Sequence, residues 1–448
     1  MNQHRSINLA TLALAVVVLG AALQVRDGLY SPLAIALLAV TCALVLLAFL
    51  PIQILRDGWT DAILAIGLLV QLGLLYTDFP GSHHHPHTWR DYWPFLAIIT
   101  AAIPVALGLI AAPRFAPVAL GLFIAIYLAA GAWLLRFTRE PLMDVFLFQR
   151  DACTAILHGT NPYAMTYANP YGPTGEWVYS AGLVKDGRLL FGFPYMPVTL
   201  GLELVGHALL HDYRYSLLVA VAGAALLIGW GSTTRRSVLA AALLLFTPRG
   251  FYLIEQGWCE PLVALLLCAT VVAAQRWARL TPILFGLLLV AKQYDLFMVP
   301  LGIMLMDDRR DLRRMATVLA IAFVAAAAAT LPLVLWDVGS FWNSAVALQF
   351  RQPFRADSLS FVALLANLGG PRAGVWPSLL AASVAIVECL RRITWKPAGF
   401  ALAVAVSYLM FFAFSKQAFA NYYLLVIAAL CCAIGRWDGL TPARANVR

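Results

Sequence analysis

Long, uninterrupted apolar runs constrain the fold of this chain more than any other feature. Three of them, Leu9–Val25, Leu33–Leu50 and Val118–Leu135, contain no charged residue. A helix needs about 20 apolar residues to cross the hydrocarbon core of a bilayer, whereas a spanning strand needs about 10 residues of alternating character. Because the runs are long and do not alternate, they predict an all-α, polytopic membrane protein.

The composition agrees with this prediction. Hydrophobic residues make up 62% of the 448-residue chain and charged residues 12%, whereas an ordinary soluble domain is about half apolar and a quarter charged. The apolar runs suffice for about 14 transmembrane helices. Their expected boundaries are 7–25, 32–50, 59–77, 93–112, 117–136, 194–211, 214–231, 237–250, 258–275, 281–306, 315–336, 374–390, 398–414 and 421–436.

Two long polar segments interrupt the series of apolar runs. The first insertion, 137–193, is rich in Pro, Gly, Tyr and Asn, and the second insertion, 337–373, holds Arg351, Arg355 and Asp357. We expect interfacial helices within both. No internal repeat is evident, so sequence symmetry gives no support to an inverted-repeat transporter.

Basic residues predict the orientation in the membrane. Lys and Arg number 31 against 22 acidic residues, and because they stand in short loops, topology explains them more simply than nucleic-acid binding does. We expect a multi-pass protein of the cell membrane with both termini in the cytoplasm and both insertions outside. The residues that agree on the cytoplasmic side are Arg5, Arg56, Arg114, Arg309–Arg314, Arg391-Arg392 and Arg436–Arg448.

One stretch conflicts with this orientation. Span counting places Arg235-Arg236 and Arg276–Arg279 outside, against the positive-inside rule. A re-entrant helix near 194–231 or a break at Lys292 would each remove the conflict, and the sequence does not choose between them.

Metal and disulfide chemistry have little support. The seven cysteines lie almost all in apolar stretches and lack paired external spacing. His83–His87 suggests metal binding, but a solvated loop is the simpler interpretation because only Asp78 and Asp91 stand nearby. We therefore predict no metal and no cofactor.

The segment Pro141–Asp151 follows a predicted span directly and offers candidate catalytic carboxylates. On a helix lying along the membrane, Asp144, Phe148 and Asp151 share a face. A carboxylate with apolar neighbours can have a raised pKa and serve as a general base. The alternatives are that Asp144 caps or solvates the helix and that Asp151 pairs with Arg150.

Several cations stand where they could hold an anion. Arg and Lys at outer helix ends suit phosphate recognition, whereas snorkelling to lipid headgroups is the alternative for each. Lys292 could instead pair with Asp295. Their convergence on one outer face predicts an anion site. The candidates are Lys292, Arg351, Arg355 and Lys416.

An aspartate after a span, Asp144, is followed by Gly159–Tyr163 and then by Phe193–Pro197. This order of motifs resembles the GT-C superfamily of membrane glycosyltransferases, and most closely the bacterial polyprenol-phosphate-mannose-dependent α-mannosyltransferase family. The resemblance covers roughly 117–436 and depends on motif order and topology. Further similarities lie at Glu255–Trp258, Ala291–Gln293 and Ser415–Tyr423.

The resemblance implies a GT-C-like helical bundle with a catalytic membrane domain at 116–436. Residues 1–115 would then be additional transmembrane helices, and 437–448 a cytoplasmic tail. Asn421 stands where the family usually has a histidine.

The implied reaction is an inverting hexosyl transfer from a polyprenyl-phosphate sugar to a glycolipid or glycan acceptor in the bilayer. Asp144 would deprotonate the acceptor, with Asp151 as a second catalytic candidate, and the cations would hold the lipid phosphate. The remaining substrate-binding candidates are Gln293, Tyr195, Tyr422, Asn161 and Tyr163.

The sequence shows neither a Gly-x-Gly-x-x-Gly motif after a strand nor a P-loop, which agrees with a lipid-linked donor and with no nucleic-acid partner. A transporter or flippase for a lipid-linked anion is the alternative, and a non-catalytic scaffold is a weaker one. Charges at helix ends and two large insertions favour the enzyme over the transporter.

Overall fold

The computed structural model describes residues 7–50, 55–81, 88, 90–172, 178–179, 182–231, 233–306 and 311–437. It is 73% helix and 2% strand, which confirms a mostly helical protein. His83–His87 and all of the predicted tail except Trp437 lie outside the described residues.

The N-terminal helices begin where the sequence offers caps. The Asn8 side chain accepts a hydrogen bond from the amide of Thr11, and the Ser31 side chain accepts one from the amide of Ala34. The elements are α1 (Leu9–Gln24), η1 (Val25–Gly28), α2 (Pro32–Leu47), η2 (Asp57–Trp59), α3 (Thr60–Leu74), α4 (Trp93–Thr100), α5 (Ala102–Ala111), η3 (Pro113–Phe115) and α6 (Ala116–Phe137).

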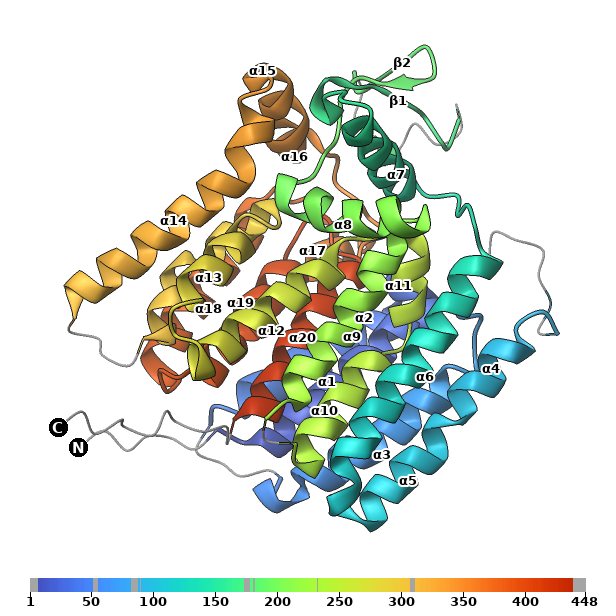
Figure 1. The fold of residues 1–448 in the computed structure, drawn as a ribbon, viewed down its shortest axis with the longest axis vertical. Helices are drawn as coiled ribbons and strands as arrows, with labels where there is room; N and C mark the ends of the chain where they lie inside the picture. The colour runs from blue at the N-terminus through green and yellow to red at the C-terminus, as the bar shows by residue number, and fades with distance from the viewer. Residues whose placement is uncertain are drawn as a thin grey trace.

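The two insertions carry short elements at one end of the molecule, where Figure 1 shows α7, α15 and α16 above the bundle. The first insertion forms α7 (Asp144–Leu157), η4 (Pro162–Ala164) and a three-stranded antiparallel sheet in the order β1-β3-β2, with β1 at Tyr167–Ala168, β2 at Val184–Lys185 and β3 at Arg188–Leu189. The second insertion forms α15 (Val338–Phe341), the π-helical η7 (Trp342–Ala347), α16 (Leu348–Arg351) and α17 (Phe361–Asn367).

The bundle continues with longer helices between and after the insertions. They are α8 (Pro197–Leu210), α9 (Arg214–Gly229), α10 (Arg235–Leu245), α11 (Gly250–Gln256), α12 (Glu260–Arg276), α13 (Thr281–Leu289), η6 (Gln293–Leu305), α14 (Leu312–Val334), α18 (Trp376–Arg392), α19 (Pro397–Ala413) and α20 (Ala420–Arg436).

Several of these helices are suited to crossing a membrane. Among the described residues, five helical stretches are long and apolar enough, and two bent pairs, α8 with α9 and α10 with α11, raise the number to seven. Further apolar helices, such as α2, α19 and α20, are only 16 or 17 residues long. The structure thus supports a membrane protein with five to seven candidate spans, whereas the larger number of spans stays a prediction.

Two breaks occur where span counting conflicted with the basic residues. Helix α8 bends by 115° into α9, and the predicted run 281–306 is divided into α13 and η6, with Lys292 extended between them. The break at Lys292 is therefore confirmed, whereas the re-entrant helix near 194–231 stays a prediction.

The basic residues that caused this conflict, Arg235-Arg236 and Arg276–Arg279, lie at the end of the bundle where α20 ends. Arg436 donates to the carbonyl of Trp230 and, at 2.8 Å, to the side chain of Gln275, which precedes Arg276. Arg235 and Arg236, at the start of α10, both form ion pairs with Asp61 of α3.

The two insertions pack against each other at the opposite end. The hydroxyl of Ser344 accepts from the amide of Gly192 at 2.9 Å and donates to the carbonyl of Tyr163 at 3.1 Å. The rings of Tyr163 and Phe341 lie 4.9 Å apart in an edge-to-face arrangement. These contacts turn two segments that are distant in sequence into one cap.

The helices before residue 116 share a hydrophobic core with the rest of the chain, since α1 packs against α20 and α3 packs against α10. Their loop also reaches the second insertion, because the amide of Tyr30 donates to the carbonyl of Asp357 at 2.8 Å. The division into 1–115 and 116–436 stays a prediction.

The α1–α2 loop has an unusual backbone. Arg26, Asp27 and Gly28 have φ values of 50°, 62° and 69°, a left-handed conformation that is unfavourable for residues with a side chain. A Cβ atom on Gly28 would lie 2.7 Å from Cβ of Ala420 at the start of α20. Glycine is required here both by its φ angle and by the close approach of α20.

Replacing Gly28 by alanine should therefore destabilise the protein by about 2 kcal/mol, from left-handed strain and the contact with Ala420. Thermal unfolding in detergent measures this effect. Gly121→Ala in α6 is the control, because nothing lies within 4 Å of the added methyl group, and it should leave the unfolding temperature equal or higher. Equal unfolding temperatures for the two variants would contradict the proposed role of Gly28.

Candidate functional site

A cavity of about 630 Å³ lies where the two insertions meet the starts of α12 and α20. Its lining combines ionisable, carboxamide and aromatic side chains from six separate parts of the chain. The polar lining residues are Asp27, Asp144, Asp357, Lys292, Arg355, Gln256, Gln349, Gln352, Gln417, Asn421, Tyr171, Tyr179, Tyr195, Tyr252 and Tyr422.

Asp144 is the first residue of α7 and lines this cavity. Its Oδ2 accepts a hydrogen bond from the Tyr179 hydroxyl at 2.9 Å, and its Oδ1 accepts one from the amide of Val145 at 2.8 Å. Burial raises the pKa of the carboxyl, while the bonds from Tyr179 and Val145 and the charge of Arg355 oppose the rise. The carboxylate is thus a stronger base than an exposed aspartate, although it also satisfies one amide of the first helical turn.

Asp151 lies apart from the cavity lining. Its Oδ1 forms an ion pair with the Nε atom of Arg150 at 2.9 Å, as the alternative interpretation of this residue expected. The two carboxylates share a face of α7, but Asp151 stands two helical turns, about 10 Å, further along the axis, and of the two only Asp144 lines the cavity.

Arg355 supplies one cation to the cavity. Its guanidinium binds the carboxylate of Asp357 through Nε at 2.8 Å and Nη2 at 2.6 Å, and it lies 5.1 Å above the ring of Phe419. Burial opposes its charge, but Asp357 and, at longer range, Asp144 raise the pKa of Arg355 above its ordinary value. Arg355 and Asp144 therefore act on each other electrostatically within the same cavity.

Lys292 supplies the second cation, from the break between α13 and η6. Its side chain pairs with Glu260, the first residue of α12, rather than with Asp295 as the sequence suggested. Asp295 instead accepts from the backbone amide of Lys292 at 2.9 Å. The ammonium lies 5.3 Å from the ring centroids of both Tyr195 and Tyr422, so two of the predicted tyrosines surround it.

The other two predicted cations, Lys416 and Arg351, do not line the cavity. The amine of Lys416 donates to the carbonyl of Gln352 at 2.6 Å, just beyond the C-terminus of α16, where a positive charge is favourable; burial lowers its pKa. Arg351 donates to the carbonyl of Asn343 at 3.1 Å. Both residues order the second insertion, which carries Gln352 and Arg355 to the cavity.

Three further predicted residues support the cavity wall from behind. Gln293 donates to the carbonyls of Pro194 at 2.8 Å and Ala345 at 2.9 Å. The Asn161 side chain accepts from the amide of Tyr163, whose hydroxyl donates to the carbonyl of Tyr195. These bonds fix the segment that presents Tyr195, so the three residues position the lining without joining it.

Several residues that line the cavity or, like Glu260, hold its lining were not foreseen from the sequence. Asp27 lies in the short loop between α1 and α2, a region that the resemblance treated as additional. Glu260 stands in an apolar context, where an acidic residue signals function by default, and this signal was overlooked. The hydrogen bond from Tyr179 to Asp144 joins residues 35 positions apart, which no local pattern predicts.

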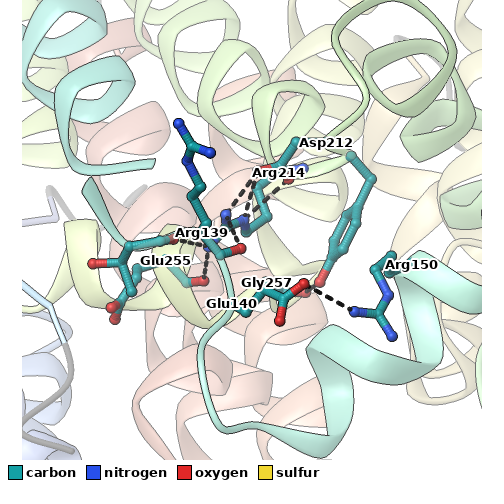
Figure 2. A network of polar contacts seen from close by, with 9 residues as sticks. Arg139, Glu140, Arg150, Asp212, Arg214, Glu255 and Gly257 are labelled. Atoms are coloured by element: carbon teal, nitrogen blue, oxygen red, sulfur yellow. Dashed lines mark hydrogen bonds and ion pairs between the residues drawn. The ribbon is translucent and has the colours of Figure 1, made fainter. Parts of the chain in front are cut away.

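A buried arginine fixes the linker that leads into Asp144 (Figure 2). Arg214, at the start of α9, is fully buried and donates to the carbonyls of Thr138 at 3.0 Å, Arg139 at 3.0 Å and Glu255 at 2.9 Å. Its guanidinium also pairs with Asp212 at 2.7 Å. One side chain thus ties the end of α6 to the end of α11, which contributes Gln256 to the cavity.

Among the described residues, no group of three or more His, Cys, Asp or Glu side chains is arranged to hold a metal ion. The histidine cluster at His83–His87 lies outside the described residues.

Arg214→Met should lower the free energy of unfolding by on the order of 3 kcal/mol, because the three carbonyls and Asp212 lose their buried charged donor. Arg150→Met is the matched control. Its ion pairs with Glu140 and Asp151 involve a side chain that is 38% exposed, so the loss should stay below about 1 kcal/mol. Denaturant titration of both variants measures the difference, and a similar loss in both would refute the role of Arg214.

Comparison with protein-family models, with curated proteins and with solved structures finds no match to this chain.

Proposed function

We propose that this protein is an inverting glycosyltransferase of the GT-C type, which moves mannose or another hexose from a polyprenyl phosphate to a glycolipid or glycan. The observation that carries the proposal is a single cavity lined by Asp144, Arg355 and Lys292. A base and cationic donors are the groups that this transfer requires, since a lipid phosphate is already a good, charged leaving group.

In the proposed reaction, the carboxylate of Asp144 removes the proton from the acceptor hydroxyl. The acceptor oxygen forms a bond to the anomeric carbon, while the bond from that carbon to the phosphate oxygen breaks and its electron pair stays on the phosphate. Attack from the face opposite the phosphate inverts the anomeric centre. The raised pKa of Asp144 makes the carboxylate a better proton acceptor for this step.

The two lining cations are suited to the departing phosphate. Arg355 lines the cavity and binds Asp357 through Nε and Nη2, and a guanidinium is a planar group of five donors whose geometry suits phosphate oxygens. Lys292 keeps donor capacity beyond its contact with Glu260. A volume of about 630 Å³ lies within the range of pockets that enclose small ligands, which is large enough for a sugar phosphate.

The distribution of charge supports an external site in the cell membrane. Arg235, Arg236 and Arg436 lie at one end of the bundle, and the cavity lies at the other, between the insertions. If the arginine-rich end is cytoplasmic under the positive-inside rule, the cavity faces the outer leaflet, where both lipid-linked substrates can enter from the bilayer.

Asp144→Asn should reduce transfer of labelled sugar from a polyprenyl-phosphate donor by about 10²–10⁴-fold, because asparagine cannot take the proton. Asp151→Asn is the control on the same helix and should retain most of the activity, since Asp151 pairs with Arg150 outside the cavity. Unchanged transfer by purified Asp144→Asn would refute the assignment. Movement of the donor across vesicles without a covalent product would favour the flippase instead.

The pH dependence of transfer provides a second test of Asp144. Because the carboxylate is the active form, the rate should rise with pH, with an inflection above the ordinary aspartate pKa of 3.8. Tyr179→Phe removes a hydrogen bond that stabilises the carboxylate, so the inflection should move to higher pH. Rate profiles of wild type and Tyr179→Phe measure this, and a shift to lower pH would contradict the role of Asp144.

A further inference from the structure

One side of the cavity is built by residues that the proposed reaction does not use. Asp27 comes from the α1–α2 loop, and Tyr252, Gln256 and Trp258 come from α11 and the turn that follows it. These segments contain neither the proposed base nor the proposed phosphate-binding cations. Their combination of carboxylate, carboxamide and aromatic groups requires a separate explanation.

Asp27 is held in place from several directions. Its carboxylate pairs with Arg249, which is itself buried and lies 4.4 Å above the ring of Tyr252. Arg249 also donates to the carbonyl of Phe79 at 2.5 Å. Arg249 therefore balances the charge of Asp27 and holds its carboxylate, an acceptor group, in the lining of the cavity.

The backbone around this ion pair is strained. Asp27 and Arg249 both have positive φ angles, 62° and 63°, and neither is a glycine. Such conformations cost about 1–3 kcal/mol each and cluster at ligand-binding and active sites. Two of the five described non-glycine residues with positive φ are therefore the residues that present and neutralise the carboxylate.

The side chains beside Asp27 suit a hydroxylated ring. Tyr252 and Trp258 pack edge to face with centroids 5.6 Å apart, and Trp258 and Gln256 both line the cavity. Aromatic faces contact the apolar C–H face of a sugar, while a carboxylate and a carboxamide bind its hydroxyl groups. A phosphate is not expected at Asp27 itself, because a carboxylate only accepts hydrogen bonds and offers a phosphate oxygen no donor.

We infer that Asp27, Gln256 and Trp258 form a subsite for a neutral sugar ring of the acceptor, so that the α1–α2 loop determines acceptor specificity. This inference rests on the proposed function in one respect, namely that the bound sugar is called the acceptor. The chemistry of the ligand, a neutral ring with hydroxyl groups, follows from the side chains themselves.

The test is the binding of n-octyl mannoside, glucoside and galactoside to the full-length protein in nanodiscs, measured by calorimetry without any donor. At least one glycoside should bind to the wild type. Asp27→Asn should weaken its binding by at least tenfold, the effect of a lost hydrogen bond to a charged group. Because the carboxylate offers a phosphate no hydrogen-bond donor, the same variant should bind labelled polyprenyl phosphate no more weakly than the wild type.

Asp78→Asn is the matched control. Asp78 also faces Arg249, at 3.8 Å from Nη1, but it does not line the cavity, so glycoside affinity should stay within about twofold. If Asp27→Asn does not fold, Trp258→Leu replaces it and should weaken glycoside binding by at least fivefold. Absence of glycoside binding to the wild type, unchanged binding after either subsite substitution, or an equal loss in Asp78→Asn would overturn the inference.

The binding test and the transfer test fail separately. Glycoside binding is measured without the donor, so a negative binding result would overturn the subsite while the transfer test of Asp144 still stood. Conversely, unchanged transfer by Asp144→Asn would refute the proposed function while a sugar-binding subsite at Asp27 still stood.

Discussion

The buried contact between Lys292 and Glu260 joins the ends of three helices beneath the cavity. Glu260 opens α12, Lys292 precedes η6, and Asn421 near the start of α20 donates to the same carboxylate oxygen of Glu260 at 2.7 Å. Removing two ions from water costs several kcal/mol each, so such a pair persists only where geometry and further hydrogen bonds compensate. The bundle provides this compensation because the ends of the three helices meet around the ion pair. The rings of Tyr195 and Tyr422 enclose the ammonium group of Lys292 on its remaining sides. This junction holds the starts of α12, η6 and α20 together and so fixes the wall that presents Lys292 and Asn421.

The cavity also depends on interactions that fix non-helical backbone. Arg214 holds the linker before α7, Lys416 holds the loop after α16, and Gln293 holds the segment before α8. Each uses side-chain donors to satisfy carbonyl groups that no helix satisfies. In an interior with little water, unpaired carbonyl groups are costly, so these bonds stabilise the loops and at the same time position the functional side chains. Polar side chains that look like ligand-binding residues in the sequence can therefore serve the backbone instead.

The sequence predicted the parts of this structure that depend on local pattern. The apolar runs located most helices, and the position of Asp144 after a span placed it on the first turn of α7. Lys416 and Arg351 were correctly placed near helix ends, but the direction of their side chains depends on carbonyl groups that only the folded chain brings near.

Asp27 and Glu260 were missed for a related reason. Their partners, Arg249 and Lys292, lie far along the chain, and one sequence contains no signal for such pairings. The number of spans stayed open because several apolar helices end near the minimum length for crossing.

The left-handed loop at Arg26–Gly28 has a consequence for how such a protein could diversify. On the proposed assignments, the groups that react lie after residue 116, whereas the loop that meets the acceptor belongs to the first helical hairpin. Reaction and recognition would then be encoded in separate stretches of the gene. Recombination that exchanged the hairpin could redirect the protein to a new acceptor while the chemistry at Asp144 stayed intact, provided that the incoming loop kept a glycine against Ala420. Exchange of the first helical hairpin would thus depend on the backbone conformation of one turn, Arg26–Gly28.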